Sequence, residues 1–407
     1  MPSAAVAVIG AGAAGLVAAA FAAASGAKVT LIERTKDGGR KILISGGGRC
    51  NVLPAVLAPE RFVTAAPKHL LRGMLRAWPL HEQREFFERD LGIPLALEEE
   101  SGKLFPRSNR AKDVRDGLLA FARSQGVEAR FECKVSDLLR SAEGFTIVTS
   151  EGAVDCDRVI LATGGLSVPA TGSDGIGLGI AQRLGHAIVD TYPALTPILA
   201  ADDRHAALAG VSLDVRLRAR LESRTEETFG GFLFTHRGYS GPSVLDISHL
   251  TERPERPVIR AQWSSLNAAD WARELGASNV SIAAILSRHV PARLGDHLMT
   301  EARIPAGGRT SSLKRSERLA LIEALTAYRL PWSGNEGYKK AEVTGGGVAL
   351  GDVDPRTLES RRLPGLYFCG EILDAFGPIG GHNFAWAWAT GRAAGRAAGS
   401  GNRPRSG

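Results

Sequence analysis

AVAVIGAGAAG, the sequence of residues 5–15, joins a short apolar segment to a turn that contains three glycines. Residues 5–9 are apolar throughout, which predicts a buried strand, and the alanine-rich stretch after the turn predicts a helix to about residue 25. Residues 28–32 predict a second strand. This order of strand, turn, helix and strand indicates a βαβ unit.

The three glycines have the spacing of a dinucleotide-binding fingerprint. Gly10 permits a tight turn, Gly12 lets the backbone approach a pyrophosphate, and Gly15 lets the helix pack closely on the strand. The start of the helix offers free N–H groups and the positive end of its dipole to phosphates. Glu33 follows at about the 20-residue distance at which an acid binds ribose hydroxyls, and its charge would repel a 2′-phosphate. A dinucleotide with free ribose hydroxyls is therefore expected.

A second glycine-rich segment, Gly38 to Asn51, contains three consecutive glycines at 46–48. Such a loop can place its backbone against an extended polar ligand, with Arg40 or Arg49 facing phosphate. A flexible surface loop is the alternative interpretation. Because the segment directly follows a nucleotide-binding unit, we favour the interpretation in which it binds a ligand.

Two further glycine clusters follow. Residues 158–162 predict a buried strand that leads into Thr163-Gly164-Gly165, where backbone again comes close to a ligand. Residues 171–175 precede a predicted helix at 176–184. Because this cluster does not directly follow a strand and its helix is short, a second dinucleotide domain is not expected.

The C-terminal part returns to glycine-rich, strand-like sequence from Val343. Residues 365–369 predict a strand, 370–383 a loop with Gly-Glu and Gly-Gly pairs, and 384–390 an apolar helix. Acidic groups after such a strand would lie near a ribityl-like polyol, and the helix N-terminus would stabilise negative charge on a reduced flavin ring. An NAD dehydrogenase has no need of this return, so the two ends of the chain together indicate FAD.

Between these ends the pattern changes twice. Residues 78–125 look mainly helical around a turn-rich piece at 102–109, and from about Tyr192 short strand-like segments are followed by helical periodicity. The predicted class is an α/β fold with an FAD-binding Rossmann-like domain, an inserted β-rich domain and a helical cap. The expected boundaries are 1–191 and 343–398 for the FAD-binding domain, 192–266 and 329–342 for the β-rich domain, 267–328 for the cap and 399–407 for a disordered tail.

The composition is that of a globular protein, with 44% hydrophobic and 23% charged residues, which excludes disorder as the main state. Glycine, at 48 of 407 residues, is in excess, but without a Gly-X-Y period it does not indicate collagen. The net charge of +7 would suit an anionic partner. No compact basic cluster with interleaved aromatics is present, so a nucleic-acid partner is not expected. Part of the positive charge lies in residues 392–407, which are expected to fray.

The cysteines Cys50, Cys133, Cys156 and Cys369 lack metal-ligand spacing, which indicates free thiols, a reducing cytoplasmic setting and no metal. Cys50 fits either an inert buried thiol or a reactive one. Residues 4–27 carry no charge, yet no Lys or Arg precedes them as a signal peptide requires, so no membrane partner is expected.

With these motifs the chain resembles a family of bacterial flavoproteins labelled BaiN-like or aminoacetone-oxidase-like NAD(P)/FAD-dependent oxidoreductases. The matching elements are 10–15 with Glu33, 39–51, 105–108 with Ala111, 234–236 with 240–242, 344–348 and 370–391. The resemblance implies an FAD domain formed by both chain ends, an inserted β-rich domain and a helical cap. Residues 171–190 also look like the corresponding stretch of fumarate reductase and succinate dehydrogenase flavoproteins.

His382 departs from the family's pattern, because members often carry Tyr after the last Gly-Gly pair. This departure leaves the substrate open. An imidazole titrates near neutral pH, which makes His382 a candidate catalytic proton donor beside the flavin. The alternative is a histidine that fixes the loop through hydrogen bonds.

The predicted activity is that of an FAD-dependent oxidoreductase that transfers a hydride between the flavin and a small organic substrate, with NAD(P)H as a possible co-substrate or oxygen closing the cycle. An FAD-dependent RNA-modifying or RNA-associated protein is the alternative, and FAD as a structural or sensory ligand is a third. The oligomeric state is left open. The candidate FAD contacts are Gly10, Gly12, Ala13, Ala14, Gly15, Glu33, Arg34, Arg40, Lys41, Ser45, Gly46, Gly47, Arg49, Asn51, Val135, Thr163, Gly164, Gly370, Glu371, Asp374, Gly381, Asn383 and Phe384.

Overall fold

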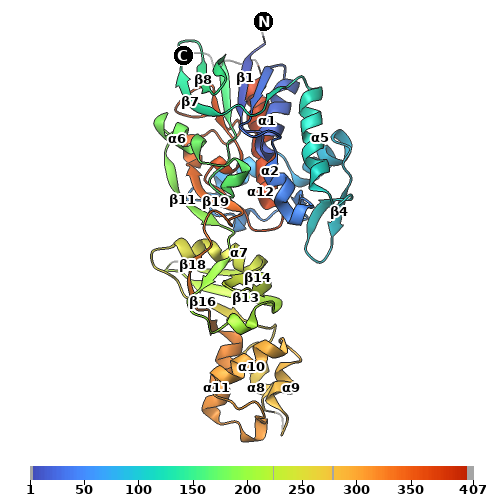
Figure 1. Ribbon diagram of the computed structural model, residues 1–407, viewed down its shortest axis with the longest axis vertical. Coiled ribbons are helices and arrows are strands. Elements are labelled where there is room, and N and C mark those ends of the chain that lie inside the picture. Colours follow the sequence, from blue (N-terminus) through green and yellow to red (C-terminus); the bar gives the residue numbers. More distant parts are fainter. Residues whose placement is uncertain (1–2, 223, 277–278, 401–407) are drawn as a thin grey trace. The chain divides into compact units, whose positions relative to one another are not determined.

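The computed structural model describes residues 3–222, 224–276 and 279–400. The chain forms two compact units, one from Met1–Tyr192 and Val343–Gly407 and the other from Pro193–Glu342 (Figure 1). The second unit is thus an insertion in the sequence of the first. The finer division of the insertion into a β-rich domain and a helical cap stays a prediction.

A parallel sheet of five strands, in the order β20-β10-β1-β2-β6, forms the centre of the first unit. Its strands are β1 (Ala5–Ile9), β2 (Lys28–Ile32), β6 (Glu128–Arg130), β10 (Arg158–Leu161) and β20 (Leu366–Phe368). Ile9 pairs with Ile32 on one side and with Leu161 on the other. Apolar residues dominate the central strands because both faces of a parallel sheet are covered. The predicted α/β class, with a β-rich insertion, is confirmed.

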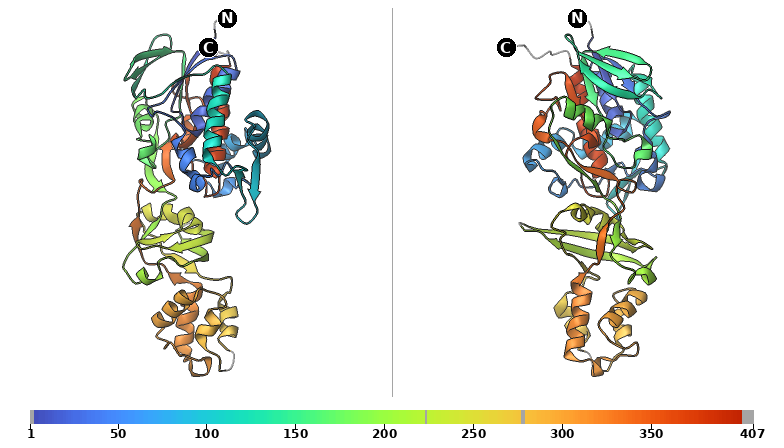
Figure 2. Two further views of the ribbon diagram at one scale, coloured as in Figure 1. Left: turned by 45° about the vertical axis from the view of Figure 1, so that its right-hand side comes forward. Right: turned by 60° about the vertical axis from the view of Figure 1, so that its left-hand side comes forward.

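Two parallel helices from opposite ends of the chain pack side by side, α1 (Ala13–Ala24) and α12 (His382–Gly399) (Figures 1 and 2). Glycines on α12 lie directly against alanine backbone on α1. An added Cβ would lie 2.5 Å from Ala14 O at Gly391, and 2.3 Å from Ala18 O at Gly395. The expectation that residues from 392 onward fray is wrong as far as residue 399, because these small residues bring the two helices into close contact.

The rest of the first unit surrounds this centre. Its helices are α2 (Arg40–Ile44), α3 (Lys68–Arg76), α4 (Leu80–Glu85), α5 (Ala111–Ser124) and α6 (Ile176–Arg183), and its strands are β3 (Leu53–Pro54), β4 (Leu95–Glu98), β5 (Lys103–Pro106), β7 (Val135–Arg140), β8 (Phe145–Thr149), β9 (Gly152–Cys156), β11 (Ile188–Ala194) and β19 (Val343–Val348). The segment 78–125 is less helical than predicted, since β4 and β5 pair in its middle. Leu95 and Leu104 bury their side chains there, which stabilises β4 in a stretch expected to be helical and β5 in the piece at 102–109 expected to be turn-rich.

The second unit contains a seven-stranded sheet in the order β17-β16-β13-β14-β15-β12-β18, whose strand pairs are antiparallel. The strands are β12 (Ile198–Ala200), β13 (Ser212–Arg220), β14 (Thr225–Phe234), β15 (Gly238–Ser240), β16 (Ile259–Gln262), β17 (Tyr328–Arg329) and β18 (Trp332–Asn335). The long β13–β14 hairpin is visible in both views of Figure 2.

Helices complete the second unit: α7 (Pro242–Ile247), α8 (Ala268–Glu274), α9 (Ile282–Leu286), α10 (Ala292–Glu301) and α11 (Arg315–Thr326). One apolar core joins strands and helices, with Val215, Phe232 and Trp263 from the sheet region and Trp271 and Leu294 from the helices. Among all described residues of the chain, no helix is both apolar enough and long enough to cross a bilayer.

Candidate functional site

The predicted binding segments meet where the parallel strands end. The chain adds β2 and β6 on one side of β1 and β10 and β20 on the other, so the strand order reverses between β1 and β10. Ligands of open α/β sheets bind at this reversal, outside the carboxyl ends of the strands. The Gly10 turn lies here, with Gly10 N donating to Ile32 O at 2.8 Å.

The fingerprint glycines are required for different reasons. Gly10 has φ +104°, and an added Cβ would lie 2.5 Å from Ala162 O. At Gly15 a Cβ would lie 1.8 Å from Gly10 O, so the protein itself demands glycine at both positions. Gly12 has an ordinary extended backbone, and no described atom lies within 4 Å of a Cβ placed there. The space that a side chain at Gly12 would enter, at the α1 N-terminus, is therefore open within the described protein.

Glu33 is held at the same turn. Its carboxylate accepts hydrogen bonds from Ala11 N at 2.7 Å and from Thr35 N and Oγ1 at 2.8 and 2.7 Å. The side chain is only 9% exposed. Because a carboxylate offers about four acceptor positions, these three bonds orient Glu33 and leave capacity for a ribose hydroxyl.

A groove of 510 Å³ adjoins the end of β2. Arg34 forms an ion pair with Asp174 and donates to Gly172 O at its edge. Thr163, beyond the end of β10, has a buried hydroxyl without a hydrogen-bond partner among the described residues. The residues that line the groove are Arg34, Thr35, Lys36, Arg40, Glu132, Pro169, Ala170 and Gly172.

The arginines predicted to face phosphate both have carboxylate partners. Arg40 Nε donates to Asp37 at 2.9 Å. Arg49 donates to Glu98 at 3.0 Å, and its guanidinium lies 3.9 Å from the centre of the Phe105 ring. Contact of either arginine with a phosphate stays a prediction.

Lys41 and Glu371 form a polar centre that links the two ends of the chain. Lys41 Nζ lies 2.8 Å from Glu371 Oε2 and 2.5 Å from Ser167 Oγ. Glu371 also accepts from Ser167 Oγ at 2.6 Å and from Thr344 N at 3.1 Å. Sequence reasoning missed Ser167 and Thr344, although both lie next to glycine clusters that it did identify.

The triple-glycine loop is tied to the start of α12. Gly46 and Gly47 have φ of +55° and +67°, and Ser45 Oγ donates to Ile42 O at 2.7 Å. Asn51, which is buried, donates its amide to Leu53 O at 3.1 Å and accepts from Gly381 N at 3.0 Å. These contacts anchor both sides of the loop, whereas Gly46, Gly47 and Gly48 are themselves exposed, so their contact with a ligand stays a prediction.

Two polar side chains that were predicted to contact FAD form hydrogen bonds with backbone groups of the protein. Asp374 accepts from Ala65 N at 2.8 Å and Thr64 Oγ1 at 3.1 Å, and burial raises the pKa of its carboxyl to about 6. Asn383 binds Gly377 twice, accepting from its N at 2.8 Å and donating to its O at 2.9 Å. Both side chains order the loop that precedes α12.

His382 is the first residue of α12 and is 6% exposed. Its ring packs edge-on against Phe62, with centroids 6.1 Å apart. Burial, assisted by the charge of Arg61, lowers the pKa of His382 to about 4, so the ring is uncharged at neutral pH. Phe384 stacks on Trp388 at 5.2 Å.

The remaining residues that were predicted to contact FAD lie near the ends of strands or at the start of α1. Cys133 N donates to Glu33 O at 3.0 Å, which places Val135 two residues from the ribose-binding position. Gly164 has φ +72°. Gly370 donates to Thr390 Oγ1 at 2.9 Å. Ala13 and Ala14 begin α1 beside Gly12.

The cysteines are free thiols. Cys50 is fully buried, and desolvation raises the pKa of its thiol to about 12. Such a thiol carries no thiolate at neutral pH, which favours the inert interpretation.

Comparisons with known proteins agree with this arrangement. The model of the HI0933-like protein Rossmann domain family matches residues 4–397. The chain belongs to this family. The ribosomal RNA dihydrouridine synthase of Escherichia coli is 34% identical over 389 residues, which cover 94% of this chain and 95% of that protein. The enzyme of the same name from Haemophilus influenzae is 32% identical, covering 94% and 95%. The 3-dehydro-bile acid delta(4,6)-reductase of Clostridium scindens is 34% identical, covering 96% and 98%.

Membership of the HI0933-like family confirms the resemblance found in the sequence and makes the chain an FAD-dependent oxidoreductase. The residues present fit FAD, since Gly12 and the unpartnered Thr163 hydroxyl follow the ends of β1 and β10, and the groove is lined by Arg34 and Thr35, which directly follow Glu33. Gly12 and the N–H groups of Ala13 and Ala14 would hold the pyrophosphate, and Glu33 the adenosine ribose.

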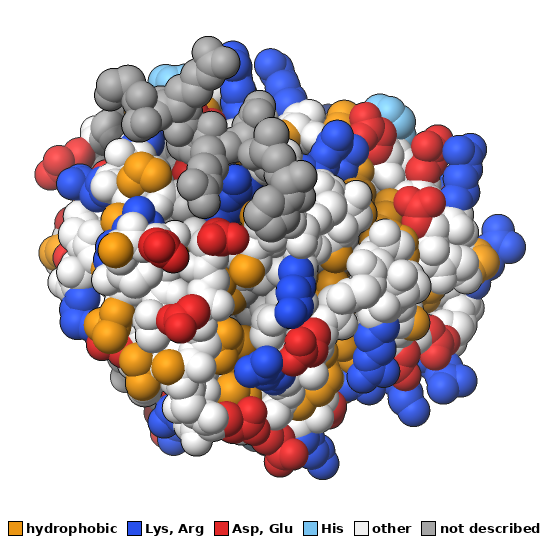
Figure 3. All heavy atoms as spheres, turned by 90° about the horizontal axis from the view of Figure 1, so that it is seen from above, with side chains coloured by type: hydrophobic (Ala, Val, Ile, Leu, Met, Phe, Trp, Pro, Cys, Tyr) orange, Lys and Arg blue, Asp and Glu red, His pale blue; other side chains and the backbone are white. Residues whose placement is uncertain are grey.

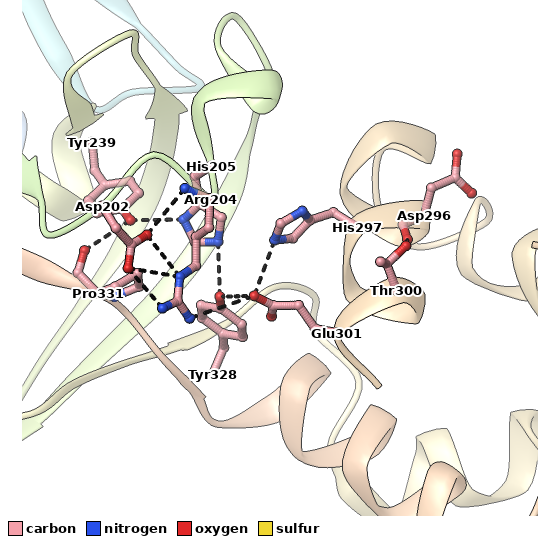
Figure 4. A network of polar contacts seen from close by, with 10 residues as sticks. All are labelled: Asp202, Arg204, His205, Tyr239, Asp296, His297, Thr300, Glu301, Tyr328 and Pro331. Atoms are coloured by element: carbon pink, nitrogen blue, oxygen red, sulfur yellow. Dashed lines mark hydrogen bonds and ion pairs between the residues drawn. The ribbon is translucent and has the colours of Figure 1, made fainter. Parts of the chain in front are cut away.

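A separate polar network lies inside the second unit of this family member (Figure 4). His205 Nδ1 contacts Tyr239 Oη at 2.8 Å and His205 Nε2 contacts Tyr328 Oη at 2.9 Å. Glu301, on α10, accepts a hydrogen bond from Tyr328 Oη through its Oε1 atom at 3.1 Å. His297, also on α10, points toward this carboxylate, with 3.4 Å between His297 Nε2 and Glu301 Oε1. Ligand atoms of His205, His297 and Glu301 lie within 4.8 Å of one another, a spacing compatible with a metal ion. Both His205 nitrogens already have hydroxyl partners, however, and the cation of Arg204 lies 3.9 Å from Glu301, which opposes a second cation.

The network predicts a pH-dependent stability. Burial, and then the charge of His297, lowers the pKa of His205 to about 4 from an ordinary 6.5. The unfolded chain therefore binds a proton that the folded chain does not, so stability is complete above pH 6.5 and falls toward pH 4. In His205→Gln, urea unfolding should show a slope of stability against pH that is smaller by up to about 1.4 kcal/mol per pH unit between pH 4.5 and 6.5.

The exposed residue His236 provides the control, because His236→Gln removes a histidine without a buried environment. Its unfolding curve should follow that of the unchanged protein. Parallel pH dependence in His205→Gln and the unchanged protein would contradict the assignment to His205.

Proposed function

We propose that this protein reduces uridine in ribosomal RNA to dihydrouridine, using FAD as its redox group. The observation that carries the proposal is the end-to-end similarity, at 34% identity, to a ribosomal RNA dihydrouridine synthase, with nearly all of both chains aligned. A second synthase of the same name is similar over the same share of the chain. RNA modification, the alternative in the sequence analysis, is thus favoured over a small organic substrate.

A second candidate function is reduction of a small enone, favoured by the bile-acid reductase relative. The two reactions share one chemistry. Dihydrouridine arises when the uracil C5=C6 bond, conjugated to the C4 carbonyl, gains a hydride and a proton, and a 3-oxo delta-4 steroid offers the same type of conjugated bond. Bound FAD, once reduced, would supply the hydride in both reactions, and the protein would supply orientation and charge.

Roles for individual residues follow from the geometry as proposals. Glu371, held by Lys41 and Ser167, would fix the loop that faces the ribityl chain, and Asp374 would order the segment before α12. His382 is uncharged in the free protein, so proton donation from its ring requires a nearby anion that raises its pKa. NAD(P)H is the proposed electron donor.

The test uses the FAD-loaded full chain, NADPH or NADH under anaerobic conditions, and unmodified ribosomal RNA transcribed in vitro. We expect dihydrouridine, detected by mass spectrometry of the digested nucleosides, to form in amounts that depend on the reductant. Rapid turnover of 3-oxo delta-4 steroids without dihydrouridine in any ribosomal RNA would replace the proposal with the second candidate.

A further inference from the structure

Part of the sheet in the second unit exposes one face, and that face is rich in arginine. Side chains alternate between faces along a strand. On β13 the buried positions are Val215, Leu217 and Ala219, so the residues between them project to the opposite, exposed face. The exposed face of β13, β14, β16 and β17 carries Arg216, Arg218, Arg220, Arg260 and Arg329.

Strand register brings these arginines together. Arg218 is opposite Arg260, and Arg260 is opposite Arg329, so three cations form a row across three adjacent strands. Like charges that face each other across strands destabilise a sheet. Arg220 and Arg329 have no carboxylate partner among the described residues, and Glu227 is shared by Arg216 and Arg218. The same face carries two carboxylates, Glu227 and Asp214, against five arginines, so it has a net positive charge.

An aromatic ring lies within this arginine surface. Phe229, opposite Arg216 on β14, is 62% exposed, an unusual position for such a large apolar side chain. The Arg216 guanidinium lies 5.6 Å from its ring centre. Leu233, two pairs further along the same face, is 37% exposed.

The charge pattern on the face drawn in Figure 3 differs. Figure 3 shows one face of the molecule, on which Lys and Arg side chains are interspersed with Asp and Glu over the described residues. The exposed sheet face, by contrast, combines a solvent-facing ring with a row of three arginines, of which only Arg218 has a carboxylate partner among the described residues. Single-stranded nucleic acid fits this combination, because bases stack on aromatic rings and arginines bind the backbone phosphates.

We propose that the exposed face of β13, β14, β16 and β17 is a binding surface for single-stranded RNA, with Phe229 as a stacking platform for a base and the five arginines as phosphate contacts. This inference rests on the proposed function and assigns part of the substrate's binding to the inserted unit. Excess cation without an anionic partner argues against a second copy of the chain as the occupant, since the same charges would then face each other.

The test uses a fluorescently labelled oligouridylate of 20 nucleotides and the FAD-loaded full chain. Its affinity is measured by fluorescence anisotropy at salt concentrations between 50 and 200 mM. Phe229→Ala should weaken binding about five- to hundredfold, the usual effect of removing a stacked ring, and Phe229→Trp should restore it. Leu319→Ala is the matched control, because Leu319 is 57% exposed on α11 of the same unit. Its affinity should be unchanged.

Charge variants give an independent readout. Arg260→Gln combined with Arg329→Gln should reduce the slope of log affinity against log salt by about 0.7 for each phosphate that the two arginines neutralise in the unchanged protein. Reduction of the flavin by NADPH in the absence of RNA should be the same in all variants.

The outcomes separate the two proposals. If the protein forms dihydrouridine and Phe229→Ala binds and modifies RNA like the unchanged protein, the assignment of RNA binding to the sheet face is wrong and the proposed function stands. If Phe229→Ala keeps the RNA affinity of the unchanged protein but forms an oligomer of different mass in solution, a second copy of the chain covers the face. If the unchanged protein neither binds nor modifies RNA but reduces enones, both proposals fail.

Discussion

Gly12→Val should yield a folded protein that no longer retains FAD. Gly12 has an extended backbone that valine can adopt, and no described atom of the protein would contact the new side chain near its Cβ. The side chain would instead fill the space at the α1 N-terminus where a pyrophosphate must approach the backbone. We expect FAD affinity to fall at least about a hundredfold, equivalent to about 2.7 kcal/mol, as measured by flavin fluorescence titration of the apoprotein.

Two measurements make this result specific. The melting temperature of the Gly12→Val apoprotein should stay within a few degrees of the unchanged apoprotein, because only a helix N-cap has been altered. Gly334→Val, at another open position with ordinary backbone in β18, should bind FAD normally. Retention of full flavin content by Gly12→Val would refute the placement of the pyrophosphate.

Gly395→Ala should be severely destabilising although it adds one methyl group. The new Cβ would lie 2.3 Å from Ala18 O, so α1 and α12 would have to move apart. Overpacking of this kind costs about 3 kcal/mol, and here it outweighs the gain of about 1 kcal/mol that alanine brings to a helix. The net loss of about 2 kcal/mol should lower the melting temperature of the holoprotein by roughly 4 to 8 °C.

Gly73→Ala is the matched control for that change. Gly73 lies within α3, and no described atom is within 4 Å of an added Cβ, so the variant should gain helix propensity without a clash. Its melting temperature should equal or exceed that of the unchanged protein. A similar small effect in Gly395→Ala would show that the two helices do not need to touch.

The parts of the fold that the sequence predicts well are local ones. The strands at 5–9 and 28–32 and the turn between them are set by adjacent residues, and the structure has them with the predicted bounds. The Lys41–Glu371 pair could not be predicted, because it joins segments 330 residues apart.

Two predictions failed for physical reasons. Residues 392–399 look like a flexible tail by composition, but Gly391, Gly395 and Gly399 recur every four residues, which puts all three on one side of a helix. The β4–β5 hairpin was missed because the apolar residues of β4 also fit a helical pattern in a short segment, and because β5 lies in the piece at 102–109 that was expected to be turn-rich. The arginine face with Phe229 was missed because its members come from four strands and are separated in sequence.

The pairing of α1 with α12 also affects how the protein is made. More than 350 residues separate the end of α1 from the start of α12. At about 5 to 20 residues per second, a ribosome needs on the order of 20 to 70 seconds to span that interval. Throughout that time the uncharged, alanine-rich N-terminal segment has no α12 to cover it, whereas Pro193–Glu342 emerges as a continuous unit with its own core. The inserted unit should therefore fold first during translation, and the nascent N-terminal segment should depend on chaperone protection until α12 is released.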